Sequence, residues 1–177
     1  MTPSPIIPEF SRVVPLSEIG AMVVAHSLKA DAEQRAALAK RFDLLTLDML
    51  SAEVTLCKDD VGIIAAGHLT AELTQRCVVS EQSVPAMISE KFSIRFVPES
   101  DAETDTEIEL GLEDCDTVFH DGRIIDLGEA VAQTLALSID PFPRSPNADD
   151  MLKKAGVKGE HEAGPFAALA ALRKGGD

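Results

Sequence analysis

Three long runs in which apolar and polar residues alternate, all between Leu44 and Phe96, constrain the fold of this chain most strongly. In the first run, LDMLSAEVTLC, apolar residues recur at every second position, and the same spacing returns in GHLTAELTQRC and EKFSIRFVP. Short polar stretches, KDD and SEQ, separate the runs. Because successive side chains of a strand point to opposite faces, this pattern predicts an antiparallel meander with one face on a core and one in water.

Two amphipathic segments predict the main helices. Residues 31–42 begin with Asp31, a favourable N-cap residue, and end with basic residues that suit the negative end of the helix dipole. Residues 127–139 have apolar side chains at helical spacing and follow Asp126, and Glu129 three positions later predicts a capping box. The stretch DPFPRSP ends this second helix, because a residue before proline favours extended backbone.

Shorter strands are expected around these elements. Residues 6–17 contain a candidate edge strand bounded by prolines, and residues 18–25 are Val-rich and predict another strand, with Gly20 at a bulge. Asp121 and Gly122 predict a hairpin turn between TVFH and RII.

We therefore expect one α+β domain over residues 1–144, built on a mostly antiparallel sheet with two main helices. An acidic loop is expected at about residues 99–115, since residues 99–121 carry ten Asp or Glu and no Lys or Arg. Residues 145–177 are expected to form a flexible C-terminal tail, a polar linker followed by a short helical segment, PFAALAALRKG.

Composition restricts the class of partner. The formal net charge is -14, aromatic residues make up 4% of the chain, and Trp and Tyr are absent. Phosphate neutralisation needs clustered Lys and Arg, and single-stranded recognition uses aromatic stacking, so direct nucleic-acid binding is disfavoured. A basic protein partner fits this charge better. The alternative is that the charge serves solubility alone.

The three cysteines, Cys57, Cys77 and Cys115, have 19 and 37 residues between them. This spacing matches neither a disulfide framework nor a zinc site, so we expect no metal, no cofactor and buried thiols at Cys57 and Cys77. No signature of a nucleophile elbow, phosphate loop, zinc protease or dinucleotide site occurs, and an enzyme is not expected. With no signal-peptide pattern and no long apolar span, we expect a cytoplasmic protein.

Three motifs in fixed order resemble the YceD-like family, the large ribosomal RNA subunit accumulation proteins: GHLTAELTQRCVVSEQSVP, IIDLGEAVAQTLALSIDPFPRSP and GPFAALAAL. The EFSR opening and the helix ending in LAKRF are similar to the alphaproteobacterial branch. The resemblance implies a role in 23S ribosomal RNA accumulation and ribosome biogenesis, without enzymatic activity. Some relatives carry Cys-x-x-Cys before the turn, whereas this chain has Thr74 in place of the first cysteine.

The resemblance also singles out positions whose roles it does not establish. In the first motif these are Gln75, Arg76 and Cys77, and in the second they are Asp126, Leu127, Asp140, Pro141 and Pro143. We expect the first motif to be a strand end entering a turn, with Cys77 buried and Gln75 and Arg76 as contact residues.

Three hypotheses about function remain open on the sequence. The first is a non-enzymatic assembly factor that binds a ribosomal protein or another assembly factor. The second is direct binding to 23S rRNA through a patch of Arg76, Lys91 and Arg95. The third is a metal or redox sensor at Cys77, whose thiol pKa Arg76 would lower. Arg144 belongs to DPFPRSP, which is either a recognition loop or a helix stop with Phe142 as a core anchor.

Overall fold

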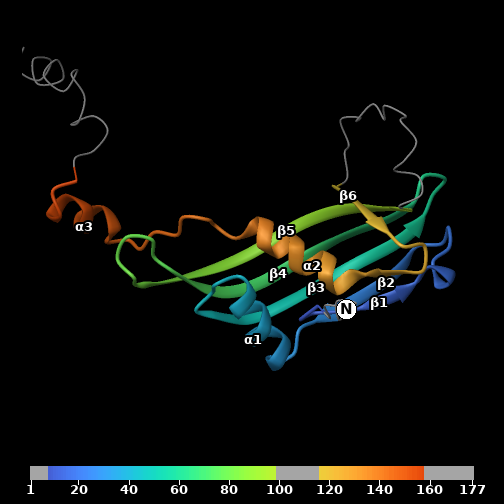
Figure 1. The fold of residues 1–177 in the computed structure, drawn as a ribbon, viewed down its shortest axis with the longest axis horizontal. Coiled ribbons are helices and arrows are strands. Elements are labelled where there is room, and N and C mark those ends of the chain that lie inside the picture. The colour runs from blue at the N-terminus through green and yellow to red at the C-terminus, as the bar shows by residue number, and fades with distance from the viewer. Residues whose placement is uncertain (1–7, 99–115, 158–177) are drawn as a thin grey trace, which may run out of the picture. The chain divides into compact units, whose positions relative to one another are not determined.

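The computed structural model describes residues 8–98 and 116–157 of the chain. Its elements follow one another in the order (Figure 1) β1 (Val13–Pro15), the short 3-10 helix η1 (Leu16–Glu18), β2 (Val24–Lys29), α1 (Ala32–Arg41), β3 (Thr46–Lys58), β4 (Ile63–Arg76), β5 (Ser83–Pro98), β6 (Asp116–His120), β7 (Ile124–Asp126), α2 (Leu127–Ser138) and α3 (Ala148–Lys154). Long strands combined with separate helices make this an α+β fold, which confirms the predicted class.

The central sheet has the strand order β2-β3-β4-β5-β6. The pairs β2–β3 and β3–β4 are antiparallel, as the alternating runs predict, with one register shift between Leu47 and Met49. β6 departs from the meander because it runs parallel to β5, with Ile94 opposite Asp116. A second, two-stranded sheet pairs β1 with β7 in antiparallel register.

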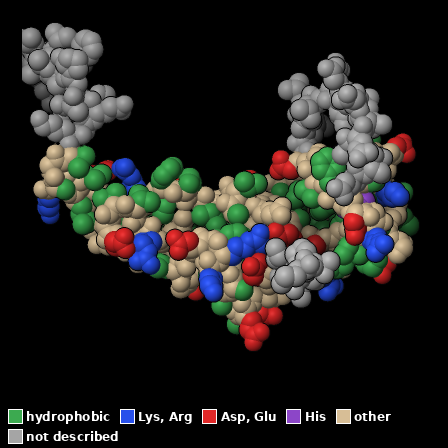
Figure 2. All heavy atoms as spheres, viewed as in Figure 1, with side chains coloured by type: hydrophobic (Ala, Val, Ile, Leu, Met, Phe, Trp, Pro, Cys, Tyr) green, Lys and Arg blue, Asp and Glu red, His purple; other side chains and the backbone are tan. Residues whose placement is uncertain are grey.

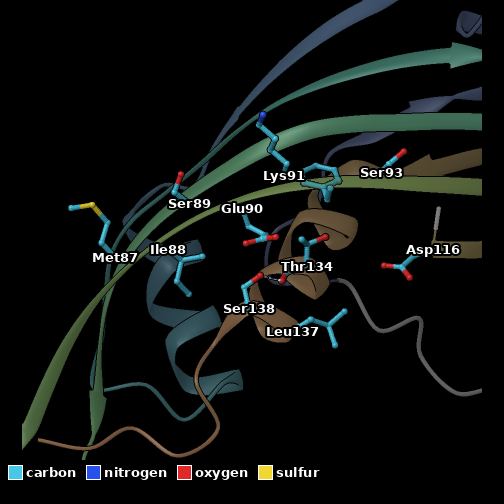
Figure 3. A pocket seen from close by; sticks show the side chains of 11 residues that line it. Met87, Ile88, Ser89, Glu90, Lys91, Ser93, Asp116, Thr134, Leu137 and Ser138 are labelled. Carbon is cyan, nitrogen blue, oxygen red and sulfur yellow. Dashed lines mark hydrogen bonds between the residues drawn. The ribbon is translucent and has the colours of Figure 1, made fainter. Parts of the chain in front are cut away.

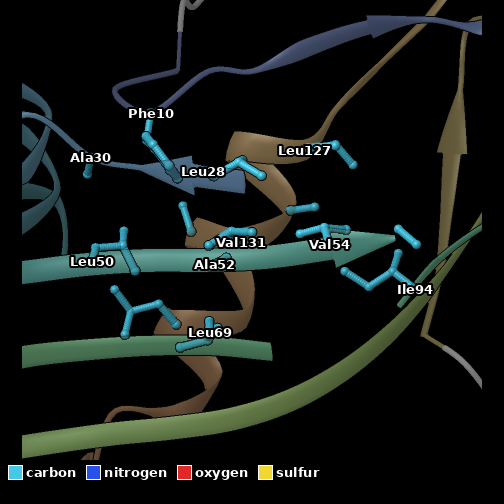
Figure 4. Close-up of a cluster of buried hydrophobic side chains, with 14 of the residues drawn as sticks. Phe10, Leu28, Ala30, Leu50, Ala52, Val54, Leu69, Ile94, Leu127 and Val131 are labelled. Atoms are coloured by element: carbon cyan, nitrogen blue, oxygen red, sulfur yellow. The ribbon is translucent and has the colours of Figure 1, made fainter. Parts of the chain in front are cut away.

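The core lies between one face of the central sheet and α2, which crosses that face (Figures 1 and 4). Alternate side chains of β3 and β4, such as Leu50 and Leu69, are completely buried there, together with Val131 of α2. Glu53 and His68 lie between the buried positions of the same strands and are exposed. This division confirms the prediction of one packed face and one face in water.

The N-terminus of α1 is a complete capping box. The backbone N–H of Gln34 donates to the carboxylate of Asp31 at 2.9 Å, and the N–H of Asp31 donates to the side-chain oxygen of Gln34 at 2.9 Å. These bonds satisfy backbone donors that a helix start leaves without partners. Asp31 is therefore the N-cap that the sequence predicts.

The start of α2 differs from its prediction. Asp126 caps the helix, since its Oδ1 accepts from the N–H groups of Gly128 (2.9 Å) and Glu129 (3.2 Å). The other half of the predicted capping box is wrong. The two carboxylate oxygens of Glu129 instead accept from Arg41 at 2.8 and 2.7 Å, so the charge of α1 draws this side chain away from the helix end.

We expect Arg41→Gln to lower the free energy of unfolding by about 1 kcal/mol, the upper range for partly exposed ion pairs. Arg41 holds Glu129 with two hydrogen bonds and also pairs with Glu9 at 3.0 Å. The hydrogen bond from Arg41 holds the pKa of Glu129 below its ordinary value of 4.5. A carboxylate with a lowered folded pKa stabilises fully above the unfolded value, and this contribution is lost as pH falls through the folded pKa.

Urea titrations at neutral pH and at successively lower pH will measure this effect. The difference between Arg41→Gln and the wild type should shrink as the solution becomes more acidic than the pKa of Glu129. Arg144→Gln is the control, because Arg144 and its partner Asp149 are more exposed, and it should change stability by less than about 0.5 kcal/mol. Equal losses for both variants, or a loss independent of pH, would contradict the prediction.

Two short-range predictions are wrong. The strand expected over residues 18–25 begins only at Val24, because the preceding residues form η1 and a bend, where the carbonyl of Gly20 accepts from the N–H of Lys58. The turn at Gly122 exists, with φ of 82°, but the strands on either side do not form a hairpin. β6 joins the central sheet and β7 joins β1, so the turn carries the chain from one sheet to the other.

The chain divides into two compact units. The first contains residues up to 75 and residues 85–140, and the second combines the turn 76–84 with the chain from residue 141 onward. α3 belongs to the second unit, in a stretch for which the sequence predicts only a polar linker. The domain boundary after residue 144 stays a prediction, and the acidic loop and the PFAALAALRKG segment lie outside the described residues.

Candidate functional site at the Cys77 turn

The second unit is built around the turn between β4 and β5. The turn closes on itself, because the N–H of Cys77 donates to the carbonyl of Gln82 at 2.8 Å and the N–H of Glu81 to the carbonyl of Cys77 at 3.2 Å. The N–H of Val78 donates to the carbonyl of Pro143 at 3.0 Å. Residues far apart in the sequence, from both resemblance motifs, are thereby held side by side.

The sulfur of Cys77 lies at the centre of this unit. Its side chain is 1% exposed, which confirms the prediction that it is buried. Sγ accepts hydrogen bonds from the N–H groups of Ser145 (3.2 Å), Ser80 (3.4 Å) and Val79 (3.5 Å). The hydroxyl groups of Ser80 and Ser145 lie 2.9 Å apart. Cys77 therefore acts as a buried acceptor that joins the turn to the segment after α2.

Two opposing effects determine the acidity of this thiol. Burial raises the pKa of Cys77, but hydrogen bonds from Ser145, Ser80 and Val79 favour the thiolate and together lower the pKa to about 6. The prediction that Arg76 would lower it finds no support among these causes, since the guanidinium of Arg76 pairs instead with Glu81 at 2.9 Å. A buried thiolate is poorly placed to attack a substrate, so the low pKa of Cys77 favours a structural role for this residue over a catalytic one.

We expect the Cys77 thiol to titrate with a midpoint at pH about 6. An ordinary cysteine thiol has a pKa of about 8.5. Because the folded pKa is the lower one, thiolate stabilisation is fully present above the unfolded value and is lost as pH falls through about 6. Ultraviolet absorbance of the thiolate, in a variant with Cys57 and Cys115 replaced by serine, will measure the midpoint. A midpoint at or above the ordinary value would contradict the described hydrogen bonds.

Two predicted contact residues lie on the exterior of this unit. Arg76 pairs with Glu81 at 2.9 Å, and Arg144 pairs with Asp149 at 3.0 Å. The arginine side chains remain 55% and 56% exposed, so each keeps surface for an external partner. Their roles as contact residues stay predictions.

The side chain of Gln75 forms a hydrogen bond within the chain. Its side chain is only 7% exposed, and its amide donates to the backbone carbonyl of Asp140 at 2.7 Å. This bond joins the end of β4 to the residue that follows α2, because Asp140 comes directly after the helix C-cap, Ile139. Two positions matched in the resemblance are therefore hydrogen-bonded to each other, and little of the Gln75 side chain is left to contact a partner.

Of the other motif positions, Leu127 and Pro143 also lie in the interior. Leu127 is buried, and its N–H donates to the carbonyl of Arg12 at 2.9 Å. Pro143 is buried, whereas Pro141 is exposed. The expectation that Phe142 anchors the core is wrong, since its side chain is 72% exposed. The prolines turn the chain there, but the aromatic ring between them faces outward.

Lys91 and Arg95 lie on β5, in the first unit, four residues apart. Lys91 is exposed, and Arg95 pairs with Asp59 at 2.8 Å. The hydrogen bond from Arg95 is the main cause that lowers the pKa of Asp59. The RNA patch predicted for these two residues and Arg76 thus draws its members from two separate units.

Metal ligation has little support among the described residues. They contain no group of three or more His, Cys, Asp or Glu side chains placed to hold a metal ion.

Cys57 is partly exposed, so the prediction that it is buried is wrong. It lies on the solvent-facing side of β3, between buried Leu56 and exposed Lys58. Within the described residues, no helix is long and apolar enough to cross a membrane.

Sequence reasoning missed two residues of the site, Ser80 and Ser145. Serine is common in turns, so neither residue stands out from its neighbours in the chain. Ser145 is 5% exposed, a rare state for a polar residue, and only the fold shows this burial. The sequence signal is that each serine belongs to a resemblance motif: Ser80 comes three residues after Cys77 in the first, and Ser145 two residues after Pro143 in the second.

The fold and this turn define a small α+β protein whose motif positions mainly hold the chain together and whose charged side chains face outward. A family model described as "Large ribosomal RNA subunit accumulation protein YceD" matches residues 65–173. This match covers more than half of the chain, and the chain belongs to the YceD family. Searches of curated proteins and of solved structures gave no match.

Proposed function

We propose that this chain is a non-enzymatic ribosome-biogenesis factor that supports 23S rRNA accumulation in the cytoplasm through a basic protein partner. The partner would be a ribosomal protein or another assembly factor. Family membership supports the role, because the family is described by large ribosomal RNA subunit accumulation. The binding mode rests on the electrostatics of the chain.

Net charge is the observation that supports a basic protein as the partner. The chain carries 30 Asp and Glu against 16 Lys and Arg. Among the described residues, Arg41, Arg76, Arg95 and Arg144 each form an ion pair with a carboxylate. On the face seen in Figure 2, the visible Lys and Arg side chains are interspersed with Asp and Glu. A negative net charge of this size attracts a basic protein and repels a phosphate backbone.

Deletion of the gene tests the role in the cell. We expect the ratio of 23S to 16S rRNA to fall and to recover when the wild-type chain is restored. A variant of this chain in which the surface that binds the partner is altered should fold normally, as judged by its urea unfolding midpoint. It should nevertheless fail to restore the ratio. An unchanged ratio after deletion would count against the proposed role.

Direct RNA binding is the second candidate, favoured by the exposure of Arg76 and Arg144. Filter binding of 23S fragments across a salt series separates the two candidates, since phosphate contacts make affinity fall steeply with salt. The proposal predicts no salt-dependent affinity. Affinity that falls with salt, and falls further in Arg76→Gln or Lys91→Gln, would favour RNA contact instead.

A further inference from the structure

Among the described residues, one edge of the central sheet is paired over only part of its length. β4 lies on one side of β5, and β6 pairs with the other side only over residues 94–98. In the part of the chain that the structure describes, no strand lies on that second side next to residues 86–92. An uncovered strand edge presents backbone N–H and C=O groups that another strand can pair with.

A groove of about 710 Å³ lies between this edge and the C-terminal half of α2 (Figure 3). Its walls include Ile88 and Phe92 of β5 and Leu137 of α2. Leu137 is 81% exposed and Met87, also on the lining, is 77% exposed. Large apolar side chains exposed beside an open strand are characteristic of an interaction surface.

The charges of the groove have one sign on the side that faces α2. Glu90 points from β5 toward α2, and Asp116 lies at the start of β6, whereas Lys91 points to the opposite side of the sheet (Figure 3). An occupant of the groove therefore meets two carboxylates and apolar side chains. Basic side chains on the occupant would complement these carboxylates.

We infer that residues 86–92 of β5 bind an extended segment of a basic protein as an added β-strand. The occupant's apolar side chains lie against Ile88 and Leu137, and its basic side chains lie near Glu90 and Asp116. Backbone pairing supplies affinity in this mode, and the alternate side chains supply specificity. The inference rests on the basic partner of the proposed function and adds the surface that the partner uses.

The charges argue against a second copy of this chain as the occupant. Two copies joined edge to edge would bring the carboxylates at Glu90 and Asp116 of one chain close to those of the other. Each chain also carries a net charge of -14. Like charges across an interface disfavour association, whereas a basic strand removes this repulsion.

The probe is a synthetic peptide with threonine at every second position and valine and lysine in turn at the positions between. Valine and lysine then lie on the same face of the strand and can reach the apolar side chains and the carboxylates of the groove together. Fluorescence anisotropy measures the peptide's affinity for the full chain, and backbone amide NMR shifts locate it. We expect binding at low salt, with the largest shifts at residues 86–92. In a strand, alternate N–H groups point to opposite sides, so two N-methylated peptides give a direct test. Methyl groups on one alternating set should abolish binding, and methyl groups on the other set should leave it nearly unchanged.

Matched variants distinguish binding at the edge of β5 from nonspecific attraction by the net charge of the chain. Glu90→Lys should weaken the peptide at least about fivefold, because it reverses a charge inside the groove. Glu53→Lys makes the same change on the exposed face of β3 and should have a smaller effect. Leu137→Ser should also weaken binding, whereas Met22→Ser, at an equally exposed methionine, should not.

Equal effects of Glu90→Lys and Glu53→Lys, or of the two methylated peptides, would overturn the inference. So would a chain that dimerises in sedimentation analysis and becomes monomeric in Leu137→Ser, because a second copy would then occupy the edge. Failure of the proposed function looks different. In that case the peptide binds at residues 86–92, yet deletion of the gene leaves 23S levels unchanged.

Discussion

Replacing Asp126 with alanine will lower the free energy of unfolding by about 2–3 kcal/mol, as the sum of a lost helix cap and donors left without their acceptor. The carboxylate accepts from four groups: the N–H of Arg12 at 2.8 Å, the hydroxyl of Ser11, and the N–H groups of Gly128 and Glu129. One side chain thus caps α2 and holds the chain before β1. The unfolding midpoint in guanidinium chloride measures the loss.

Asp31→Ala is the matched control for this variant. Asp31 also caps a helix, but among the described residues its carboxylate accepts only from the N–H of Gln34, so its loss should cost about 1 kcal/mol. Asp126→Asn keeps an acceptor oxygen and should cost less than Asp126→Ala. If Asp126→Ala proves no more harmful than Asp31→Ala, the contacts to Ser11 and Arg12 contribute nothing.

Gly128→Val is expected to destabilise the chain by about 3 kcal/mol, the upper range for overpacking. A Cβ at Gly128 would lie 2.4 Å from the carbonyl oxygen of Phe10 and 2.8 Å from the backbone nitrogen of Arg12. Both contacts are with backbone, which moves less readily than a side chain. The first turn of α2 fits against the segment before β1 only because position 128 has no side chain.

Gly20→Val controls for the general effect of replacing glycine. A Cβ at Gly20 meets nothing within 4 Å, so this variant should stay within about 0.5 kcal/mol of the wild type. Thermal and chemical unfolding of both variants provide the comparison. Similar midpoints for the two variants would show that the close approach at Gly128 carries no cost.

These two residues give the second family motif a structural meaning. Asp126 and Gly128 hold the start of α2, and Gln75 ties the end of β4 to Asp140. Positions matched by resemblance can therefore serve folding alone. The predicted contact residues that keep exposed charge are Arg76 and Arg144, and these remain the better candidates for external binding.

The parts of the fold that sequence predicts are those governed by local periodicity. Alternation over residues 46–58 and 63–76 specifies strands with one buried face, because only a half-buried strand favours that pattern. Asp31 identifies a helix start, because its short carboxylate satisfies free backbone donors. Each of these signals acts within a few residues of the chain.

The failures concern the choice between distant partners. The Asp121-Gly122 turn is real, but local turn chemistry does not decide whether the strands beside it pair with each other or with β5 and β1. The sequence predicts that Glu129 completes a capping box, yet Arg41, distant in sequence, binds it. The hydrogen bonds to Cys77 from Ser145 likewise depend on tertiary contact.

The proposed function requires that the chain act through a basic protein rather than through RNA. Pull-down of the tagged chain from cell lysate, with and without ribonuclease treatment, tests it most directly. We expect basic proteins of the large ribosomal subunit or its assembly to stay bound after ribonuclease treatment. They should be lost from the Glu90→Lys variant but not from Glu53→Lys. Retention lost entirely with ribonuclease, or recovery of neither ribosomal proteins nor rRNA, would contradict it.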